Sequence, residues 1–373
     1  MLKITMHGYF GFDNIGDEAI LYSMIQGIKS INENSRITVL SSSPEKTSRR
    51  YNVHSISRVN FWRIMGSLRK SQLFISGGGS LLQDVTSFYS PLYYLFVMQL
   101  AARFAKKSVF AFQGFGPLKS KILRKLTVNS LTKMDEISVR DEKSRAKLVQ
   151  MGLPEERVRK IFDPVFLLTP EKVSREAVVK NSDENNEDIN SRYNLGVAVR
   201  PWGDNKYLQE VITAVNRFIE EYPEFKLTLI PLHYESDIKS VRKVKNNLSG
   251  RDMQNIKVVS PIEHPREITD IFSKLDLLLG VRLHSLIFAT LLGVPCVGIE
   301  YDPKIPAFLS QLELEPAGKT EEISARKIYN DLVYYWNNRN IISSKQRNFA
   351  LACKQEIESY LERLINIAQI RDE

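Results

Sequence analysis

The chain has 373 residues, of which 43% are hydrophobic and 25% are charged, a balance typical of soluble globular proteins. This length suits two domains of moderate size better than one core. Two cysteines, Cys296 and Cys353, are too few for a disulfide framework, and the absence of a CxxC pair gives no indication of zinc. The net charge of +9 favours anionic partners, but the basic residues are spread out rather than gathered into a nucleic-acid stripe.

Two segments bear on location. The first residues, Met1 to Thr5, do not form a charged segment followed by an apolar one, so we expect no secretion signal and a reducing cytoplasm. The longest uncharged stretch, Val85 to Ala102, contains Pro91 and Gln99. A spanning helix needs about 20 predominantly apolar residues, so this stretch predicts a buried helix instead.

Apolar runs of strand length alternate with helix-length segments, which predicts βαβ units with parallel sheets. The expected strands are Leu2–Met6, Ile37–Leu40, Leu73–Ser76, Val109–Phe112, Glu136–Val139 and Arg159–Phe162, then Leu195–Val199, Leu227–Ile230, Lys257–Val259, Leu275–Leu279 and Cys296–Ile299. We therefore expect an α/β protein with Rossmann-like domains at 1–170 and 193–343, a polar linker at 171–192 and a C-terminal helical segment at 344–373.

Ligands of parallel sheets bind beyond the carboxyl ends of the strands, so the residues that follow each strand are the candidates for a site. After the first strand, a glycine-rich loop with Asp13 and Asn14 leads to a helix that opens at Asp17. Asp17 either caps this helix or acts on a ligand. Glycines 77–79 and Ser80 follow another strand, and they form either a phosphate cradle or a tight turn.

Cations follow four further strands. Arg140 either binds an anion or pairs locally with its acidic neighbours, and Arg200 follows the first strand of the second domain. Arg282 and His284 follow another strand, and Lys304 lies just beyond the next one. If these two strands pair, the three groups meet at one edge and suit a small anion. His284 can instead cap the helix that follows it.

Five segments together resemble the polysaccharide pyruvyl transferases, in particular the CsaB-like branch. They are Gly11–Glu18, Gly77–Gly79, Ser138–Asp141, Gly280–Ser285 and Tyr301–Lys304. The resemblance implies a GT-B-like fold with two domains facing across a cleft. It also implies transfer of pyruvate from phosphoenolpyruvate, a co-substrate rather than a cofactor, to N-acetylmannosamine of a lipid-linked secondary cell-wall polymer precursor. The product is a 4,6-linked ketal that serves S-layer anchoring.

Carried onto this chain, the resemblance makes His284, Lys304 and Asp17 the catalytic candidates. The substrate-binding candidates are Arg140, Arg282, Asp13, Asn14, Gly77, Gly78, Gly79 and Ser285. His284 is the candidate general acid, Lys304 either neutralises the departing phosphate or is itself the acid, and Arg140 and Arg282 bind the anion. Asp17, if it does not merely cap its helix, accepts a sugar hydroxyl proton. No metal is required if the cations are arginine and lysine.

Two other functions remain open: a nucleotide-sugar glycosyltransferase of GT-B architecture, and a noncatalytic glycan-binding protein. The acceptor sugar, the ketal stereochemistry and the oligomeric state are not determined by the sequence. The densest basic group is Lys119, Lys121, Arg124 and Lys125, on a predicted helix that also carries Ile122 and Leu126. This helix is either a solvated face over a core or a peripheral contact with anionic lipid at the inner face of the plasma membrane.

Overall fold

The computed structural model describes residues 1–85, 87–168, 193–248 and 256–370. The chain divides into two compact units, Met1–Leu168 with Ala352–Glu373, and Thr169–Leu351. The predicted linker at 171–192 lies outside the described residues. No described helix is long and apolar enough to cross a membrane.

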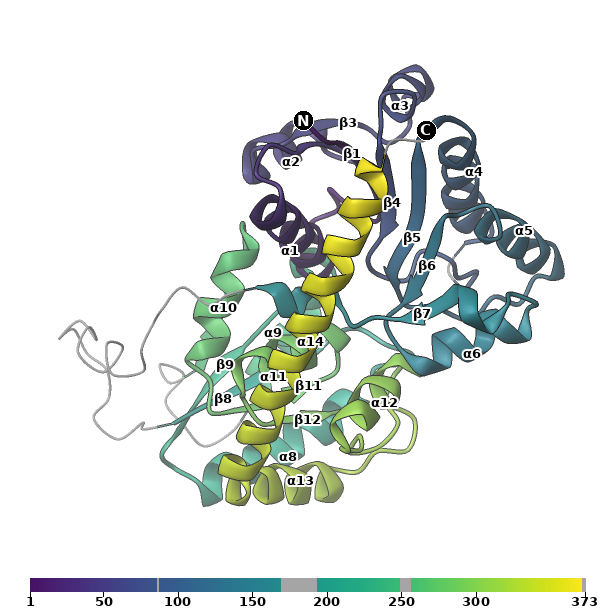
Figure 1. Ribbon diagram of the computed structural model, residues 1–373. Coiled ribbons are helices and arrows are strands. Elements are labelled where there is room, and N and C mark those ends of the chain that lie inside the picture. Colours follow the sequence, from purple (N-terminus) through teal and green to yellow (C-terminus); the bar gives the residue numbers. More distant parts are fainter. Residues whose placement is uncertain (86, 169–192, 249–255, 371–373) are drawn as a thin grey trace. The chain divides into compact units, whose positions relative to one another are not determined.

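The first unit is built on a parallel sheet of seven strands in the order β3-β2-β1-β4-β5-β6-β7 (Figure 1). Its strands are β1 (Lys3–His7), β2 (Arg36–Ser41), β3 (His54–Ser57), β4 (Leu73–Gly77), β5 (Lys107–Gln113), β6 (Glu136–Val139) and β7 (Val158–Lys160). Six of these confirm predicted strands. We did not predict β3, because its polar His-Ser-Ile-Ser sequence at the sheet edge carries almost no apolar signal.

Helices cover both faces of this sheet. They are α1 (Ile15–Ile31), α2 (Pro44–Tyr51), α3 (Phe61–Leu68), α4 (Tyr89–Phe104), α5 (Lys121–Leu131), α6 (Glu142–Gln150), and the 3₁₀ turns η1 (Glu155–Arg157) and η2 (Pro164–Leu167). Apolar side chains of α3, α4 and α5 share one core with Phe74 and Phe110 of the sheet. On α1, Gly27 lies against Leu361 and Leu167 so closely that a methyl group would clash with both.

The second unit has a parallel sheet of five strands in the order β10-β9-β8-β11-β12. The strands are β8 (Tyr193–Ala198), β9 (Phe225–Leu229), β10 (Ile256–Val258), β11 (Leu277–Gly280) and β12 (Cys296–Gly298). The helices are α8 (Tyr207–Glu221), α9 (Tyr234–Asn246), α10 (Pro265–Ser273), α11 (Leu283–Leu292), α12 (Lys304–Leu309), η4 (Ser310–Leu312) and α13 (Ala325–Asn337). All five predicted strands are confirmed, so both units are Rossmann-like.

The last helix, α14 (Arg339–Gln369), is continuous over 31 residues and begins before the predicted start. Its residues up to Leu351 belong to the second unit and those from Ala352 to the first. In the first unit the Tyr360 ring meets the Phe112 ring edge-on at 5.4 Å, and Arg363 pairs with Glu136.

The predicted buried helix over Val85–Ala102 needs a correction. A helix is present as α4, but only one side of it is buried. Tyr89 is 79% exposed and Phe96 is 53% exposed, because nothing in the described part of the chain covers that side. An apolar sequence does not reveal which of its sides a neighbouring element will cover.

Candidate functional site

The carboxyl ends of three adjacent strands in the second unit carry the predicted cations. β8 pairs with β11, and β11 pairs with β12, all in parallel. The pairing of β11 with β12 is therefore confirmed. The predicted convergence of Arg282, His284 and Lys304 depended on this pairing. Arg200 follows β8, so it joins the same edge. We call the carboxyl ends of β8, β11 and β12, with Arg200, Arg282, His284 and Lys304, the cationic edge.

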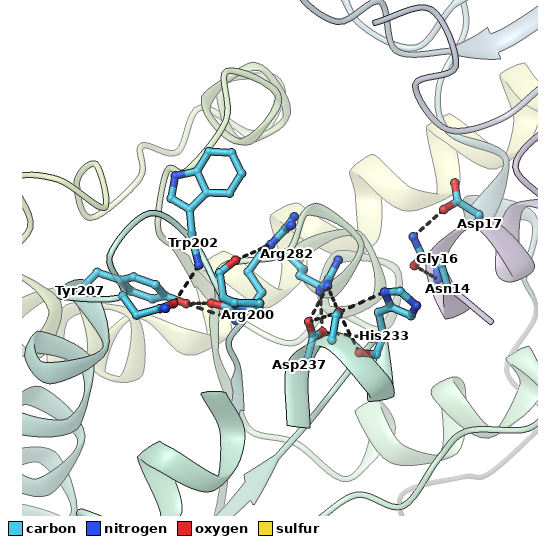
Figure 2. Close-up of polar contacts among 12 residues, drawn as sticks. Asn14, Gly16, Asp17, Arg200, Trp202, Tyr207, His233, Asp237 and Arg282 are labelled. Atoms are coloured by element: carbon cyan, nitrogen blue, oxygen red, sulfur yellow. Dashed lines mark hydrogen bonds and ion pairs between the residues drawn. The ribbon is translucent and has the colours of Figure 1, made fainter. Parts of the chain in front are cut away.

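Arg282 is held by an acidic partner that the sequence analysis missed. Its Nε donates to Oδ2 of Asp237 at 2.6 Å, and its Nη2 donates to Oδ1 of the same carboxylate and to Ser236 Oγ at 3.0 Å (Figure 2). Asp237 is fully buried in the first turn of α9, whereas 13% of the Arg282 side chain is exposed. The guanidinium is thus fixed in one orientation with part of its surface open.

A second histidine belongs to this edge. His233 precedes α9, its backbone N–H donates to Asp237 at 3.0 Å, and its Nδ1 shares a hydrogen bond with Ser236 Oγ at 3.0 Å. Partial burial and then the Arg282 cation lower the pKa of His233 below its ordinary value. Inspection of the residues that follow each strand would have found His233 and Asp237, because both come shortly after β9.

Arg200 and Lys304 both lie beside the Tyr301 ring. The Arg200 guanidinium is 4.6 Å from the centre of this ring and the Lys304 ammonium is 5.2 Å from it. Trp202 meets Tyr301 edge-on at 4.9 Å. Burial alone would raise the pKa of the Tyr301 phenol, but the Lys304 and Arg200 cations lower it below its ordinary value. The Tyr207 hydroxyl binds both backbone groups of Arg200 and holds this loop (Figure 2).

The remaining predicted residues of this edge lie at the start of α11. The N-cap position falls on Arg282 and not on His284, which is half-buried near Phe288. Ser285 is fully buried, and its hydroxyl donates to the Arg282 carbonyl oxygen. Ser285 therefore stabilises the turn that presents Arg282 and His284.

In the first unit, the loop after β1 and the glycine-rich turn after β4 meet at Asp17. Asn14, not Asp17, is the N-cap of α1, because its Oδ1 accepts from the Gly16 backbone N–H. The Asn14 amide also donates to Asp17 at 2.6 Å (Figure 2). Gly79 has a φ of +73°, and a Cβ there would lie 2.7 Å from Asp17 Oδ1. Only glycine lets the turn approach this carboxylate so closely.

The other residues of these two motifs have structural partners. Asp13 is exposed and pairs with Lys46 at 2.8 Å and with Arg50 at 3.5 Å. Gly77 is buried as the last residue of β4, and a Cβ on Gly78 would clash with Ile20. These contacts position the loop and the turn around Asp17.

Arg140 is paired, but not with its sequence neighbours. Its Nη1 donates to Asp163 at 3.0 Å and its Nη2 donates to Ser80 Oγ at 3.3 Å, while Asp141 caps α6. Both members of the Arg140–Asp163 pair are more than nine-tenths buried. Arg140 thus joins the glycine-rich turn to the segment after β7.

An aromatic cluster surrounds the end of β1. His7 is fully buried, and its ring lies 5.1 to 5.8 Å from those of Phe74, Tyr93 and Tyr94. The Arg58 guanidinium lies 4.3 Å from the centre of the Tyr93 ring. Next to this cluster, Tyr9 and Phe12 stack at 4.1 Å. Burial and then the Asp17 carboxylate raise the pKa of the Tyr9 phenol above its ordinary value.

Two Rossmann-like units and a cationic edge define an α/β protein with the GT-B type of architecture. The family model of polysaccharide pyruvyl transferase matches residues 14–303. The chain therefore belongs to the polysaccharide pyruvyl transferase family and is a transferase. A search of curated proteins finds no match.

Solved structures of the same fold align with nearly the whole chain. Staphylococcus aureus MnaA, in a co-structure with UDP, is 14% identical over 98% of both chains, with a TM-score of 0.64. The UDP-GlcNAc 2-epimerase of Neisseria meningitidis, bound to UDP-GlcNAc, is 14% identical over 98% of this chain and 100% of its own, with a TM-score of 0.64. Anabaena Alr3699/HepE, in complex with UDP and glucose, is 12% identical over 98% of both, with a TM-score of 0.62. At these identities the likeness shows the fold alone.

The buried His7 should make stability depend on pH. Burial and then Arg58 lower the pKa of His7 from 6.5 to about 3, so the folded state excludes a proton that the unfolded state binds. The free energy of unfolding therefore has its full value above pH 6.5 and decreases as the pH falls toward 3. By pH 5 the decrease is about 2 kcal/mol. Urea unfolding at pH 7 and pH 5 should therefore show a smaller pH dependence for His7→Gln than for wild type. Equal dependence in both would contradict this.

The Arg282–Asp237 pair should stabilise the second unit. Asp237→Ala leaves a cation without its buried partner and should lower the free energy of unfolding by about 3–5 kcal/mol. The apolar double variant Arg282→Met/Asp237→Leu should recover much of this loss, because no buried charge remains. Lys206→Ala removes a pair that is exposed on both sides and serves as the control; its urea midpoint should equal that of wild type. A midpoint for Asp237→Ala that matches this control would refute the prediction.

Proposed function

We propose that the chain transfers the pyruvyl group of phosphoenolpyruvate to two hydroxyls of one sugar as a 4,6-linked ketal. In this proposal the acceptor is N-acetylmannosamine of a lipid-linked secondary cell-wall polymer precursor in the cytoplasm, as in the CsaB-like branch. The ketal would serve S-layer anchoring. The observation that carries the proposal is the cationic edge, where three cations follow three adjacent parallel strands.

The charges of this edge match those of phosphoenolpyruvate. The donor carries a carboxylate and a phosphate on one carbon, so it needs at least two cationic contacts close together. Arg282 offers the open part of a fixed guanidinium, and it is the N-cap of α11, so the positive end of that helix dipole lies beside it. Lys304 and Arg200 supply further positive charge beside Tyr301. Each charge-assisted contact contributes roughly 1.5–3 kcal/mol to binding.

The reaction requires one proton at the methylene carbon and two new carbon–oxygen bonds. Protonation converts the methylene to a methyl group and gives the central carbon oxocarbenium character. Attack by one hydroxyl forms one bond, and departure of phosphate with attack by the second hydroxyl closes the ketal. One of the two hydroxyl protons replaces the proton donated to the methylene carbon, and the other leaves with phosphate.

Two groups of the cationic edge are candidates for the acid. His284 lies beside Arg282 at the start of α11, and imidazole titrates near neutral pH. Lys304 is the alternative, since its ammonium group lies beyond the neighbouring strand and beside Tyr301. His233 is less suited, because its lowered pKa reduces its protonated fraction.

The first unit has features that suit a sugar. Asp17 supplies a carboxylate that accepts a hydroxyl proton in our proposal. The stacked Tyr9 and Phe12 rings offer an apolar face of the kind against which a pyranose ring packs. The glycine-rich turn approaches this carboxylate closely at Gly79. Arg140 contributes to this unit as a positioning residue, since its guanidinium is committed to Asp163 and Ser80.

A donor screen separates this proposal from the glycosyltransferase alternative. The purified protein is incubated with N-acetylhexosamine lipid analogues and either phosphoenolpyruvate or UDP-sugars. Phosphate release together with a product heavier by one pyruvyl ketal supports the proposal. UDP release without consumption of phosphoenolpyruvate would support the alternative, and neither product would favour a glycan-binding protein.

Alanine variants of Arg282, His284 and Lys304 test the roles within the cationic edge. Arg282→Ala should weaken donor binding roughly 10- to 100-fold, because it removes a charged hydrogen-bond donor. His284→Ala should lower turnover by about 10²–10⁴-fold if it is the acid, and if it turns over normally, the acid is Lys304. Single-turnover kinetics with varied phosphoenolpyruvate separate donor affinity from rate.

Two further variants control for folding and for charge. Arg282→Lys keeps the charge but loses the planar fork, so donor binding should recover only in part. Arg242→Ala removes an exposed cation of α9 and should behave as wild type. Wild-type donor affinity and rate in Arg282→Ala, His284→Ala and Lys304→Ala would show that this edge is not the active site.

A further inference from the structure

One side of the first unit exposes large apolar side chains that its core does not use. They belong to α3, α4, α5 and the segments just before α3 and α4, and we call them the apolar patch: Val59, Phe61, Trp62, Val85, Phe88, Tyr89, Phe96, Ile122 and Leu126. Trp62 is 80% exposed and Ile122 is 65% exposed. Single exposed apolar residues are ordinary, but a group of this size marks an interaction surface.

Five aromatic members of the apolar patch make ring contacts with one another in two groups. The Phe61 ring lies 5.3 Å from that of Trp62 and 6.4 Å from that of Phe96, which joins α3 to α4. Phe88 and Tyr89 meet edge-on at 5.9 Å at the start of α4. α3 packs against α4 and α4 against α5, so the three helices form one layer (Figure 1).

This layer lies in the most basic part of the chain. From Lys46 to Met134 there are fifteen lysines and arginines and one acidic residue, Asp84. The rest of the chain has 37 basic and 42 acidic residues, so this part supplies all of the positive excess. The Asp84 carboxylate is engaged internally, because it accepts the backbone N–H groups of Lys119 and Ser120.

Exposed basic side chains lie next to members of the apolar patch in the sequence of α3 and α5. Arg63 is exposed on α3 next to Trp62, and Lys121, Arg124 and Lys125 are exposed on α5 around Ile122. The helices α3, α4 and α5 contain no acidic residue. Exposed tryptophan and tyrosine bordered by lysine and arginine are typical of surfaces that enter the headgroup region of a bilayer.

We infer that the apolar patch and its basic border dock the first unit on an anionic lipid bilayer. This inference extends the proposed function, because a lipid-linked acceptor lies in such a bilayer. The patch lies largely at the starts of α3, α4 and α5, which follow the carboxyl ends of β3, β4 and β5. Asp17 lies beyond the carboxyl end of β1 in the same parallel sheet, so docking here brings the acceptor headgroup to the edge that carries Asp17.

Vesicle sedimentation tests the inference without any substrate. The full-length protein is mixed with phosphatidylcholine vesicles that contain or lack phosphatidylglycerol, at low and high salt. We expect binding to the anionic vesicles only, and its loss at 1 M salt, where the Debye length falls to about 3 Å. Arg63→Glu/Lys121→Glu/Lys125→Glu should lower the partition coefficient roughly a hundredfold, since each basic residue adds about fivefold. Trp62→Ser/Phe96→Ser should lower it roughly tenfold.

Matched variants on the second unit serve as controls. Arg242→Glu/Lys243→Glu/Lys257→Glu changes the net charge by the same amount at exposed positions, and Tyr334→Ser/Ile341→Ser removes two exposed apolar side chains. Both should bind vesicles as wild type does. Equal binding to neutral and anionic vesicles, equal loss in the test and control variants, or no binding would overturn the inference.

Two further readouts distinguish lipid docking from a protein interface and from a loss of catalysis. If wild type forms oligomers without lipid and Trp62→Ser/Phe96→Ser is monomeric in light scattering, the apolar patch is a protein interface and the inference is wrong. Turnover of a short soluble acceptor should be the same in wild type and in the patch variants. Failure of vesicle binding with this turnover intact would reject membrane docking and leave the proposed pyruvyl transfer standing.

Discussion

The cationic edge of the second unit depends on the ion pair between Arg282 and Asp237. A fully buried carboxylate costs much free energy unless it is paired, and the two-point contact with Arg282 meets this requirement. The same contact sets the direction of the guanidinium, and Ser236 and the His233 backbone complete the network. A cation held in this way meets an anion without first losing conformational entropy.

Arg140 and Arg282 have similar positions in the sequence, but they differ in burial and in the side chains around them. Arg140 and Arg282 each follow a strand, and each is bound to a buried aspartate. Arg140 is almost wholly enclosed and also holds Ser80, so its charge is used within the first unit. Arg282 keeps an open part and has aromatic residues and further cations on the neighbouring strand ends. In our proposal, side-chain exposure and neighbouring residues, rather than residue type, distinguish the positioning role of Arg140 from the donor-binding role of Arg282.

The two kinds of positive charge in this protein suit different anions. At the cationic edge the charges are few, and two of them, Arg200 and Lys304, lie against one aromatic ring, an arrangement that suits a small, multiply charged ligand. On α3 and α5 they are exposed and spread along a layer of aromatic side chains, an arrangement that suits an extended anionic surface. Dispersed surface charges act through a screened long-range field, whereas fixed charges act through direct contacts.

The sequence by itself determined the parallel α/β architecture, because buried parallel strands leave continuous apolar runs between helical segments. It also placed Arg282, His284 and Lys304 after successive strands, since strand ends are local features, and the pairing of β11 with β12 then brought them to one edge of the sheet. Only the tertiary structure decided that Asp237 holds Arg282 and that Asp163 holds Arg140, because these partners lie 45 and 23 residues apart. It alone decided that Phe96 and Ile122 are exposed, since apolar residues at helical spacing do not specify which element will cover them.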